Sequence, residues 1–268
     1  MKSNKELIKI ANKVRKEILM MAYKSEMGHV GSAFSVVEIL IFLYFRIMQL
    51  QPLKPKFSGR DRFILSKGHA ASALYAVLKE KGILSKSQLD QYCRDRGSLE
   101  VHPSHHVNGI EISTGSLGHG LPIGVGMAMA VKLKKRSEKV YVLLSDAECD
   151  EGETWAAILS AAHYKLDNLT VFLDYNKVQA LGRKKDILDI EPLRKKFEAF
   201  GWTVSEADGH DFYSLQNAYH LTIKSGGPKV LICHTIRGKG VSFMEHVIEW
   251  HYLHPTKEHV IRALRELH

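Results

Sequence analysis

Residues 140–182 read VYVLLSDAECDEGETWAAILSAAHYKLDNLTVFLDYNKVQALG, and this stretch decides the fold. It contains two apolar runs, 140–144 and 169–173, of the kind that form strands buried on both faces. Between them, residues 154–164 carry a helical pattern. Strand, helix and strand in this order predict a right-handed βαβ unit, which brings the C-terminal ends of both strands to one edge of a sheet.

Two polar residues follow these strands at that predicted edge. Asp146 comes directly after the first run, and Asn176 comes shortly after the second. Taken singly, Asp146 would more often cap the following helix and Asn176 would more often form a turn. Together they offer the hard oxygen ligands that Mg²⁺ or Ca²⁺ prefers, in the crevice where open α/β sheets bind ligands. The pair therefore favours a metal site.

Strands and helices alternate along the rest of the chain. Further strands are expected at residues 61–66, 202–207 and 229–235. Further helices are expected at residues 4–24, 35–48, 121–135, 191–200, 210–224 and 256–267. This alternation predicts an α/β fold, a mostly parallel sheet with helices on both faces, built as a single domain over residues 1–268.

Composition narrows the functional classes. The chain is 45% hydrophobic and 25% charged, as in ordinary globular proteins. No apolar run approaches the roughly 20 residues that cross a bilayer, and the N-terminus lacks the apolar core of a signal peptide, so we expect no membrane association and a cytoplasmic location. The net charge of +9 comes from scattered Lys and Arg, which favours solvated faces or anionic ligands over nucleic acid.

Three glycine-containing segments could line the same edge of the sheet. Residues 28–32 are expected to form a loop, and residues 67–70 join a strand to a helix N-terminus, which is a natural anion site. Residues 114–120 form a glycine-rich turn that lets the backbone approach a ligand closely. Each segment alone is a weak signal.

Histidines and cysteines do not indicate a zinc site. His105 and His106 are adjacent, so their side chains point in different directions, and no carboxylate is fixed nearby. The cysteines are widely separated and form no C-x-x-C pair, which disfavours both a disulfide framework and zinc. They are Cys93, Cys149 and Cys233.

Taken together, these segments resemble the transketolase family. Residues 140–182 resemble its thiamine-diphosphate motif, which begins Gly-Asp-Gly and ends in Asn, and the EG-x-x-W-x-A and HYKLDNL-x-x-x-x-DYNK patterns carry most of the specificity. The segments GH-x-G-x-x-x-S-x-x-E from Gly28 and DRFILSKGHA from Asp61 resemble further family segments. One departure is that the motif reads Ser145-Asp146-Ala147, so Ala147 must present its N–H without glycine's conformational freedom.

The resemblance implies thiamine diphosphate with Mg²⁺ or Ca²⁺ as cofactors. The metal would be held by Asp146, Asn176 and the carbonyl of Val178. The cofactor would contact His69, Gly115, Ser116, Leu117, Asp146, Ala147, Glu151, Asn176 and His251, with Glu151 in an acidic network at a subunit interface. His29, His102 and His251 would contact the sugar and share proton transfers, which suits groups that titrate near neutrality.

The implied activity is transfer of a two-carbon ketol group from a ketose or its phosphate to an aldose or its phosphate. The chain corresponds to the first of three family domains, whereas the activating glutamate lies in the second. We therefore expect a separate C-terminal subunit that carries this glutamate, in an α2β2 heterotetramer. One alternative is a related thiamine enzyme acting on an unusual sugar, and another is a non-catalytic scaffold subunit. A generic nucleotide-binding sheet is disfavoured, because GKS/T and GxGxxG are absent.

Overall fold

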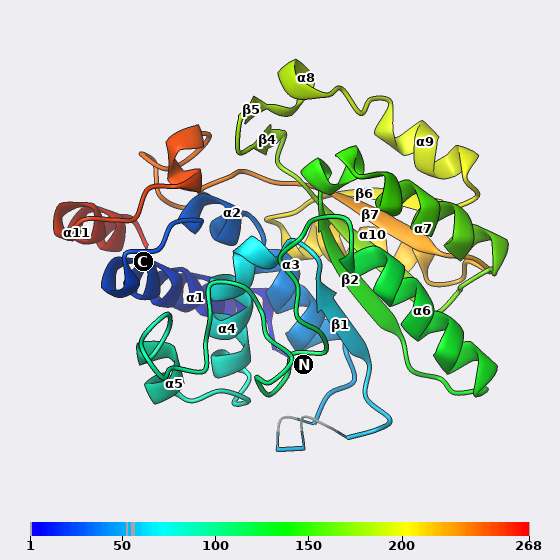
Figure 1. The fold of residues 1–268 in the computed structure, drawn as a ribbon, viewed down its shortest axis with the longest axis horizontal. Helices are drawn as coiled ribbons and strands as arrows, with labels where there is room; N and C mark the ends of the chain where they lie inside the picture. Colours follow the sequence, from blue (N-terminus) through cyan, green and yellow to red (C-terminus); the bar gives the residue numbers. More distant parts are fainter. Residues whose placement is uncertain (1, 52, 55–56, 268) are drawn as a thin grey trace.

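The computed structural model describes residues 2–51, 53–54 and 57–267 (Figure 1). A five-stranded sheet has the order β1-β2-β3-β7-β6, and every neighbouring pair in it is parallel. Its strands are β1 (Arg62–Leu65), β2 (Val140–Ser145), β3 (Leu169–Tyr175), β6 (Thr203–Asp208) and β7 (Lys229–His234). The predicted parallel α/β fold is confirmed. A small antiparallel hairpin, β4 (Val178–Gln179) with β5 (Gly182–Arg183), was not predicted.

Helices cover both faces of the sheet because strand side chains point alternately to the two sides. From β2, Val142 and Leu144 join one apolar core, whereas Tyr141 and Leu143 join the other. Figure 1 shows the first face covered by α6 (Gly120–Leu133), α7 (Gly152–His163) and α9 (Leu193–Ala199). The second core includes residues of α1 (Asn4–Ser25), α3 (Val37–Phe42), α4 (Ala71–Glu80), α10 (Phe212–Thr222) and α11 (Lys257–Glu266).

The predicted loop at 28–32 and helix at 35–48 are partly wrong. A first helix, α2 (Val30–Ser35), already begins inside the predicted loop, and the chain bends at Val36 before α3 and a π-helical turn, η1 (Leu43–Ile47). Gly31 is helical, and its glycine serves close packing, because a Cβ there would lie 3.1 Å from Arg237 Cγ. The glycine that suggested a loop therefore marks a tertiary contact.

Short elements complete the chain. They are η2 (Gly68–Ala70), α5 (Lys86–Asp90), η3 (Asp146–Asp150), α8 (Lys184–Ile187) and η4 (Ile248–His251). Within the described residues, no helix is both long and apolar enough to cross a membrane. The register places Ser145 beside Asp174, and Asp174 beside Cys233, so the C-terminal ends of β2, β3 and β7 are level. This common edge positions the residues discussed below.

Helix α6 packs on β2 through a glycine, which gives a test of the fold. A Cβ on Gly124 would lie 2.6 Å from Val142 Cγ2, whereas a Cβ on Gly126 would meet nothing within 4 Å. We expect Gly124→Ala to lower the free energy of unfolding by about 1–3 kcal/mol through overpacking. The matched change Gly126→Ala should raise it by about 0.5–1 kcal/mol, because alanine favours the helix. Denaturant titration measures both, and equal effects would contradict this packing.

Candidate active site

A pocket of about 230 Å³ lies at the edge where β2 and β3 end. Most of the predicted site residues line it, namely His29, His69, His102, Gly115, Leu117, Asp146, Ala147, Asn176, Val178 and His251. Ser116 is exposed and Glu151 is half-buried, and neither lines the pocket. Their predicted roles stay predictions. The fold thus gathers, in one place, side chains from segments that are far apart in the sequence.

Four histidines meet on one side of the pocket. The ring centroid of His29 lies 5.6 Å from that of His69, 6.5 Å from that of His102 and 5.0 Å from that of His251. The backbone N–H of His29 donates to the carbonyl of His251, which ties the start of α2 to η4. The buried Nδ1 of His29 has no hydrogen-bond partner. This nitrogen is therefore free for a ligand.

Burial keeps these imidazoles neutral. It lowers the pKa of His29 to about 4 and the pKa of His251 to about 3, and nearby cationic groups such as Arg237 lower both further. Burial also lowers the pKa of His69 and of His102. At neutral pH each ring carries one N–H donor and one acceptor nitrogen, so the group can hold sugar hydroxyls or pass a proton without carrying charge.

The predicted metal ligands lie at the other side of the pocket. Asp146 is 1% exposed, and its Oδ2 accepts a hydrogen bond from the backbone N–H of Lys177 at 2.7 Å. Its Oδ1 is buried and has no partner. Burial and the neighbouring Asp174 raise the pKa of Asp146 to about 7. A cation at Oδ1 would satisfy this oxygen and stabilise the ionised carboxylate, so Asp146 fits a divalent metal.

The other two predicted ligands already have contacts. Asn176 Oδ1 accepts from the backbone N–H of Val178 at 3.0 Å, and the Val178 carbonyl accepts from Arg237 Nη1 at 3.2 Å. Both oxygens keep a second lone pair, so these bonds are compatible with metal ligation. Among the described residues no group of three or more His, Cys, Asp or Glu could hold a metal. A single carboxylate with amide and carbonyl oxygens leaves the remaining positions to water or diphosphate.

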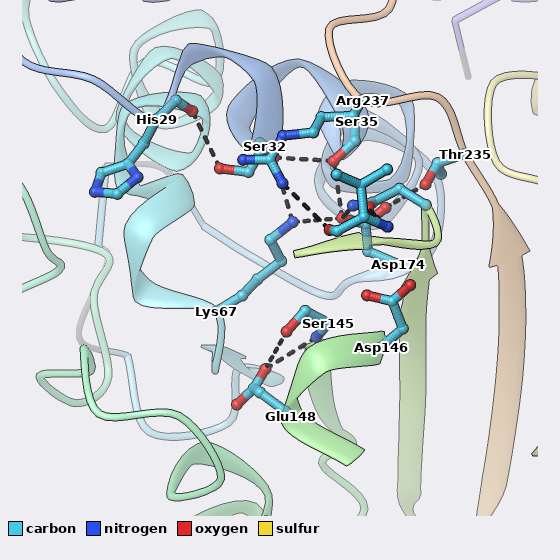
Figure 2. Close-up of polar contacts among 12 residues, drawn as sticks. His29, Ser32, Ser35, Lys67, Ser145, Asp146, Glu148, Asp174, Thr235 and Arg237 are labelled. Carbon is cyan, nitrogen blue, oxygen red and sulfur yellow. Dashed lines mark hydrogen bonds and ion pairs between the residues drawn. The ribbon is translucent and has the colours of Figure 1, made fainter. Parts of the chain in front are cut away.

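A buried ion pair that we did not predict lies beneath the pocket. Figure 2 shows Lys67 extending from the segment before η2 to the carboxylate of Asp174, and both side chains are 0% exposed. Asp174 also accepts hydrogen bonds from Ser35, Asn176 and Thr235. Although burial acts to raise the pKa of Asp174, Lys67 and these donors bring it below its ordinary value. The network joins α2, β3 and the end of β7.

Arg237 is a second buried cation that we did not predict. Its side chain lines the pocket and the residue is 2% exposed. Its Nη2 contacts His251 Nδ1, and its Nε is buried without a partner. A buried guanidinium that has no carboxylate partner suits an anion. The signal available in the sequence was a cation directly after a buried strand, since such a charge needs a partner.

The two glycine replacements in the motif are accommodated by local structure. Ala147 lies in η3 and has no left-handed φ, so its backbone does not require glycine. Ser145 and Glu148 form a capping box, in which the Ser145 N–H donates to Glu148 Oε2 at 2.9 Å. Glu148 is fully buried and also accepts hydrogen bonds from Ser66 and from the Gly118 N–H. The carboxylate of Glu148 thus joins three segments that border the pocket.

The remaining residues of interest lie outside this pocket. His105 is exposed and contacts Ser113, and its ring lies 3.9 Å from that of His106. Cys149 is 2% exposed, and burial raises its pKa, so it remains a protonated thiol. None of these three side chains gains a role from the structure.

Comparison with known proteins identifies the family. The model of the transketolase thiamine diphosphate binding domain matches residues 8–267. One of the two subunits named for the apulose-4-phosphate transketolase of Phocaeicola vulgatus is 41% identical over 258 residues, which are 96% of this chain and 92% of that protein. A 6-deoxy-6-sulfo-D-fructose transketolase subunit of a Clostridium species is 40% identical over 259 residues, covering 96% of this chain and 94% of that protein.

A solved structure agrees with these relatives. The crystal structure of transketolase from Campylobacter jejuni matches with a TM-score of 0.95 and 29% identity, over 99% of this chain and 43% of that chain. The chain therefore belongs to the transketolase family, as the thiamine-diphosphate-binding part of a transferase. The resemblance found in the sequence is confirmed, and thiamine diphosphate is its cofactor.

The neutral histidines predict how stability depends on pH. The pKa of His29 is about 4 in the folded chain, below its ordinary value of 6.5, so the unfolded chain binds more protons between these values. Its contribution to stability is thus present at higher pH and is lost as the pH falls from about 6.5 to about 4. We expect His29→Asn, which tolerates the positive φ of 67°, to lose less stability than the wild type on acidification.

Denaturant unfolding between neutral pH and about pH 4 provides the measurement. The exposed His254 offers a control, since His254→Asn should follow the wild-type profile. Parallel profiles for the wild type and His29→Asn would mean that His29 is not held neutral by the pocket.

Proposed function

We propose that this chain is the cofactor-binding subunit of a two-chain transketolase that moves a two-carbon ketol group from a ketose to an aldose. The observation that carries the proposal is a pair of unsatisfied buried groups in one pocket. Asp146 Oδ1 lacks a cation, and Arg237 Nε lacks an acceptor. A metal ion bound to a diphosphate supplies a positive and a negative partner together, which fits both groups at once.

The residues of the pocket divide the work. Asp146, Asn176 and the Val178 carbonyl would hold Mg²⁺ or Ca²⁺, while His69, Arg237 and the Gly115 to Leu117 backbone would hold the rest of the cofactor. When bound, thiamine diphosphate supplies a nucleophilic carbon and an electron sink for cleavage of the ketose.

The histidines would act on the sugar. His29, His102 and His251 are neutral and line the same pocket, so they can orient donor hydroxyls and take or return a proton. The unpartnered Nδ1 of His29 is the nitrogen most available for such a contact. A charged imidazole could only donate, so neutrality is what allows both directions of transfer.

A partner subunit would complete the enzyme. The relatives that this chain matches over nearly their whole length are named as subunits, whereas it spans 43% of the Campylobacter jejuni transketolase chain. We place the activating glutamate on a separate C-terminal subunit, within an α2β2 heterotetramer. The three cysteines are unpaired, which suits a reducing compartment and supports a cytoplasmic location.

The donor would be an anionic ketose outside the common set of sugars. Two of the similar proteins are named for apulose-4-phosphate and for 6-deoxy-6-sulfo-D-fructose, and each of these names contains a phosphate or a sulfonate group. The net charge of +9 on this chain would attract such substrates. The common sugar phosphates of transketolases are the second candidate, supported by the similarity to the Campylobacter jejuni enzyme.

Reconstitution tests this function. The chain is mixed with the product of an adjacent gene that matches the remainder of transketolase, and ketol transfer is measured from several anionic ketoses in the presence of Mg²⁺ and thiamine diphosphate. We expect transfer by the mixture and none by either chain alone. Asp146→Ala in the mixture should abolish the transfer, because the metal loses its only carboxylate ligand, whereas Asp167→Ala, at an exposed ion pair with Lys132, should not.

Full activity of this chain alone would contradict the two-chain arrangement. Absence of thiamine diphosphate binding by the mixture, measured by titration calorimetry, would favour the scaffold alternative. Transfer from common sugar phosphates with no preference for other ketoses would reject the proposed donor class and retain the enzyme class.

A further inference from the structure

A second buried carboxylate, that of Glu38 in α3, lies outside the pocket lining. It is 6% exposed and has two neighbours that bind it. The guanidinium of Arg15 binds it bidentately, with Nη1 and Nη2 at 2.7 and 2.8 Å, and His210 Nδ1 lies 2.8 Å from Oε2. Burial acts to raise the pKa of Glu38, but Arg15 and His210 lower it to about 2, so the carboxylate stays ionised.

Each of these neighbours also holds the backbone of the turn that carries Arg237. His210 Nε2 accepts the backbone N–H of Ile236 at 2.8 Å, so its proton lies on Nδ1 and is donated to Glu38. Arg15 Nε donates to the carbonyl of Lys239 at 2.8 Å. The backbone is therefore held on both sides of Arg237, and both attachments lead to the same carboxylate.

The turn has little freedom apart from these attachments. The N–H of Gly238 donates to the carbonyl of Gly31 at 2.9 Å, which joins the turn to α2. The guanidinium of Arg237 is a planar, rigid fork, so a small shift of the backbone would move all of its donors out of line with a ligand. The geometry of Arg237 thus depends on how the backbone at Ile236 and Lys239 is fixed.

We propose that Glu38 is a positioning residue that acts through Arg15 and His210 to aim Arg237 at the diphosphate of the cofactor. The identity of that ligand rests on the proposed function above. Glu38 touches neither the pocket nor the cofactor, and its effect on binding passes through Arg237. A buried ion pair with no such role would affect folding stability alone.

A double-mutant cycle between Glu38 and Arg237 tests this role. Glu38→Gln keeps the shape but loses the charge and one acceptor, so it cannot serve both Arg15 and His210. We expect it to weaken binding of thiamine diphosphate with Mg²⁺ by about 10-fold, as for other residues that orient a ligand's contacts. In an Arg237→Met background the same change should have an effect of less than about 2-fold, because the group that it aims is gone.

Calorimetry on the full chain, together with its partner subunit where the wild type requires one, measures these affinities. Glu111→Gln is the matched control, because Glu111 pairs with Arg60 at 2.6 Å, is similarly enclosed and lies outside the pocket. It should change stability without changing affinity. Should Glu38→Gln not fold, His210→Phe removes the acceptor of the Ile236 N–H and leaves the Arg15–Glu38 pair intact.

Amide hydrogen exchange on the chain without ligand gives a second readout. The Ile236 amide should exchange faster in Glu38→Gln and in His210→Phe than in the wild type, and at the wild-type rate in Glu111→Gln. Equal losses of affinity in both Arg237 backgrounds, or unchanged exchange at Ile236, would overturn the positioning role. A wild-type chain that binds no thiamine diphosphate, with or without its partner, would instead overturn the proposed function and this inference with it.

Discussion

The buried ion pair between Lys67 and Asp174 is the interaction on which the pocket depends. Two opposite charges at 0% exposure stabilise a fold only when their remaining hydrogen-bonding capacity is satisfied. Asp174 meets this condition through Ser35, Asn176 and Thr235. These donors belong to α2, to the chain after β3 and to the chain after β7, so satisfying one carboxylate fixes three borders of the site.

The same constraint explains the division of charge within the pocket. Lys67 neutralises Asp174, which leaves the neighbouring Asp146 with a buried oxygen and no cation of its own. Arg237 has no carboxylate among its hydrogen-bond partners. One unmatched acceptor and one unmatched donor remain for a metal diphosphate, beside histidines that burial keeps neutral. The fold therefore places fixed, incompletely paired groups where the cofactor of this family would bind.

Local pattern and topology predicted the sheet and part of the site. Two apolar runs joined by a helix were sufficient to predict that Asp146 and Asn176 share an edge, because the handedness of the βαβ unit leaves few alternatives. The histidines and the loop at Gly115 came from the resemblance to a family. The short hairpin β4–β5 was missed, since two-residue strands leave no periodic signal.

Buried charges were the other omission, and the reason is physical. Sequence periodicity shows which apolar residues face a core, but it does not show which charged residues are buried in pairs, because their partners are distant in the chain. Lys67 and Asp174 are 107 residues apart, and Arg15 and Glu38 are 23 apart. Gly31 was misjudged for a related reason, since its role is to admit Arg237 and not to form a loop.

The most direct test of this account is the free energy of unfolding in a cycle of Lys67→Met, Asp174→Asn and the double variant. We predict that Lys67→Met alone costs about 3–5 kcal/mol, because it leaves a buried carboxylate uncompensated, and that the double variant recovers much of this loss. The exposed pair of Lys132 with Asp167 sets the scale, since Lys132→Met should cost no more than about 1 kcal/mol. Costs for Lys67→Met as small as those for Lys132→Met would contradict the central role of the buried pair.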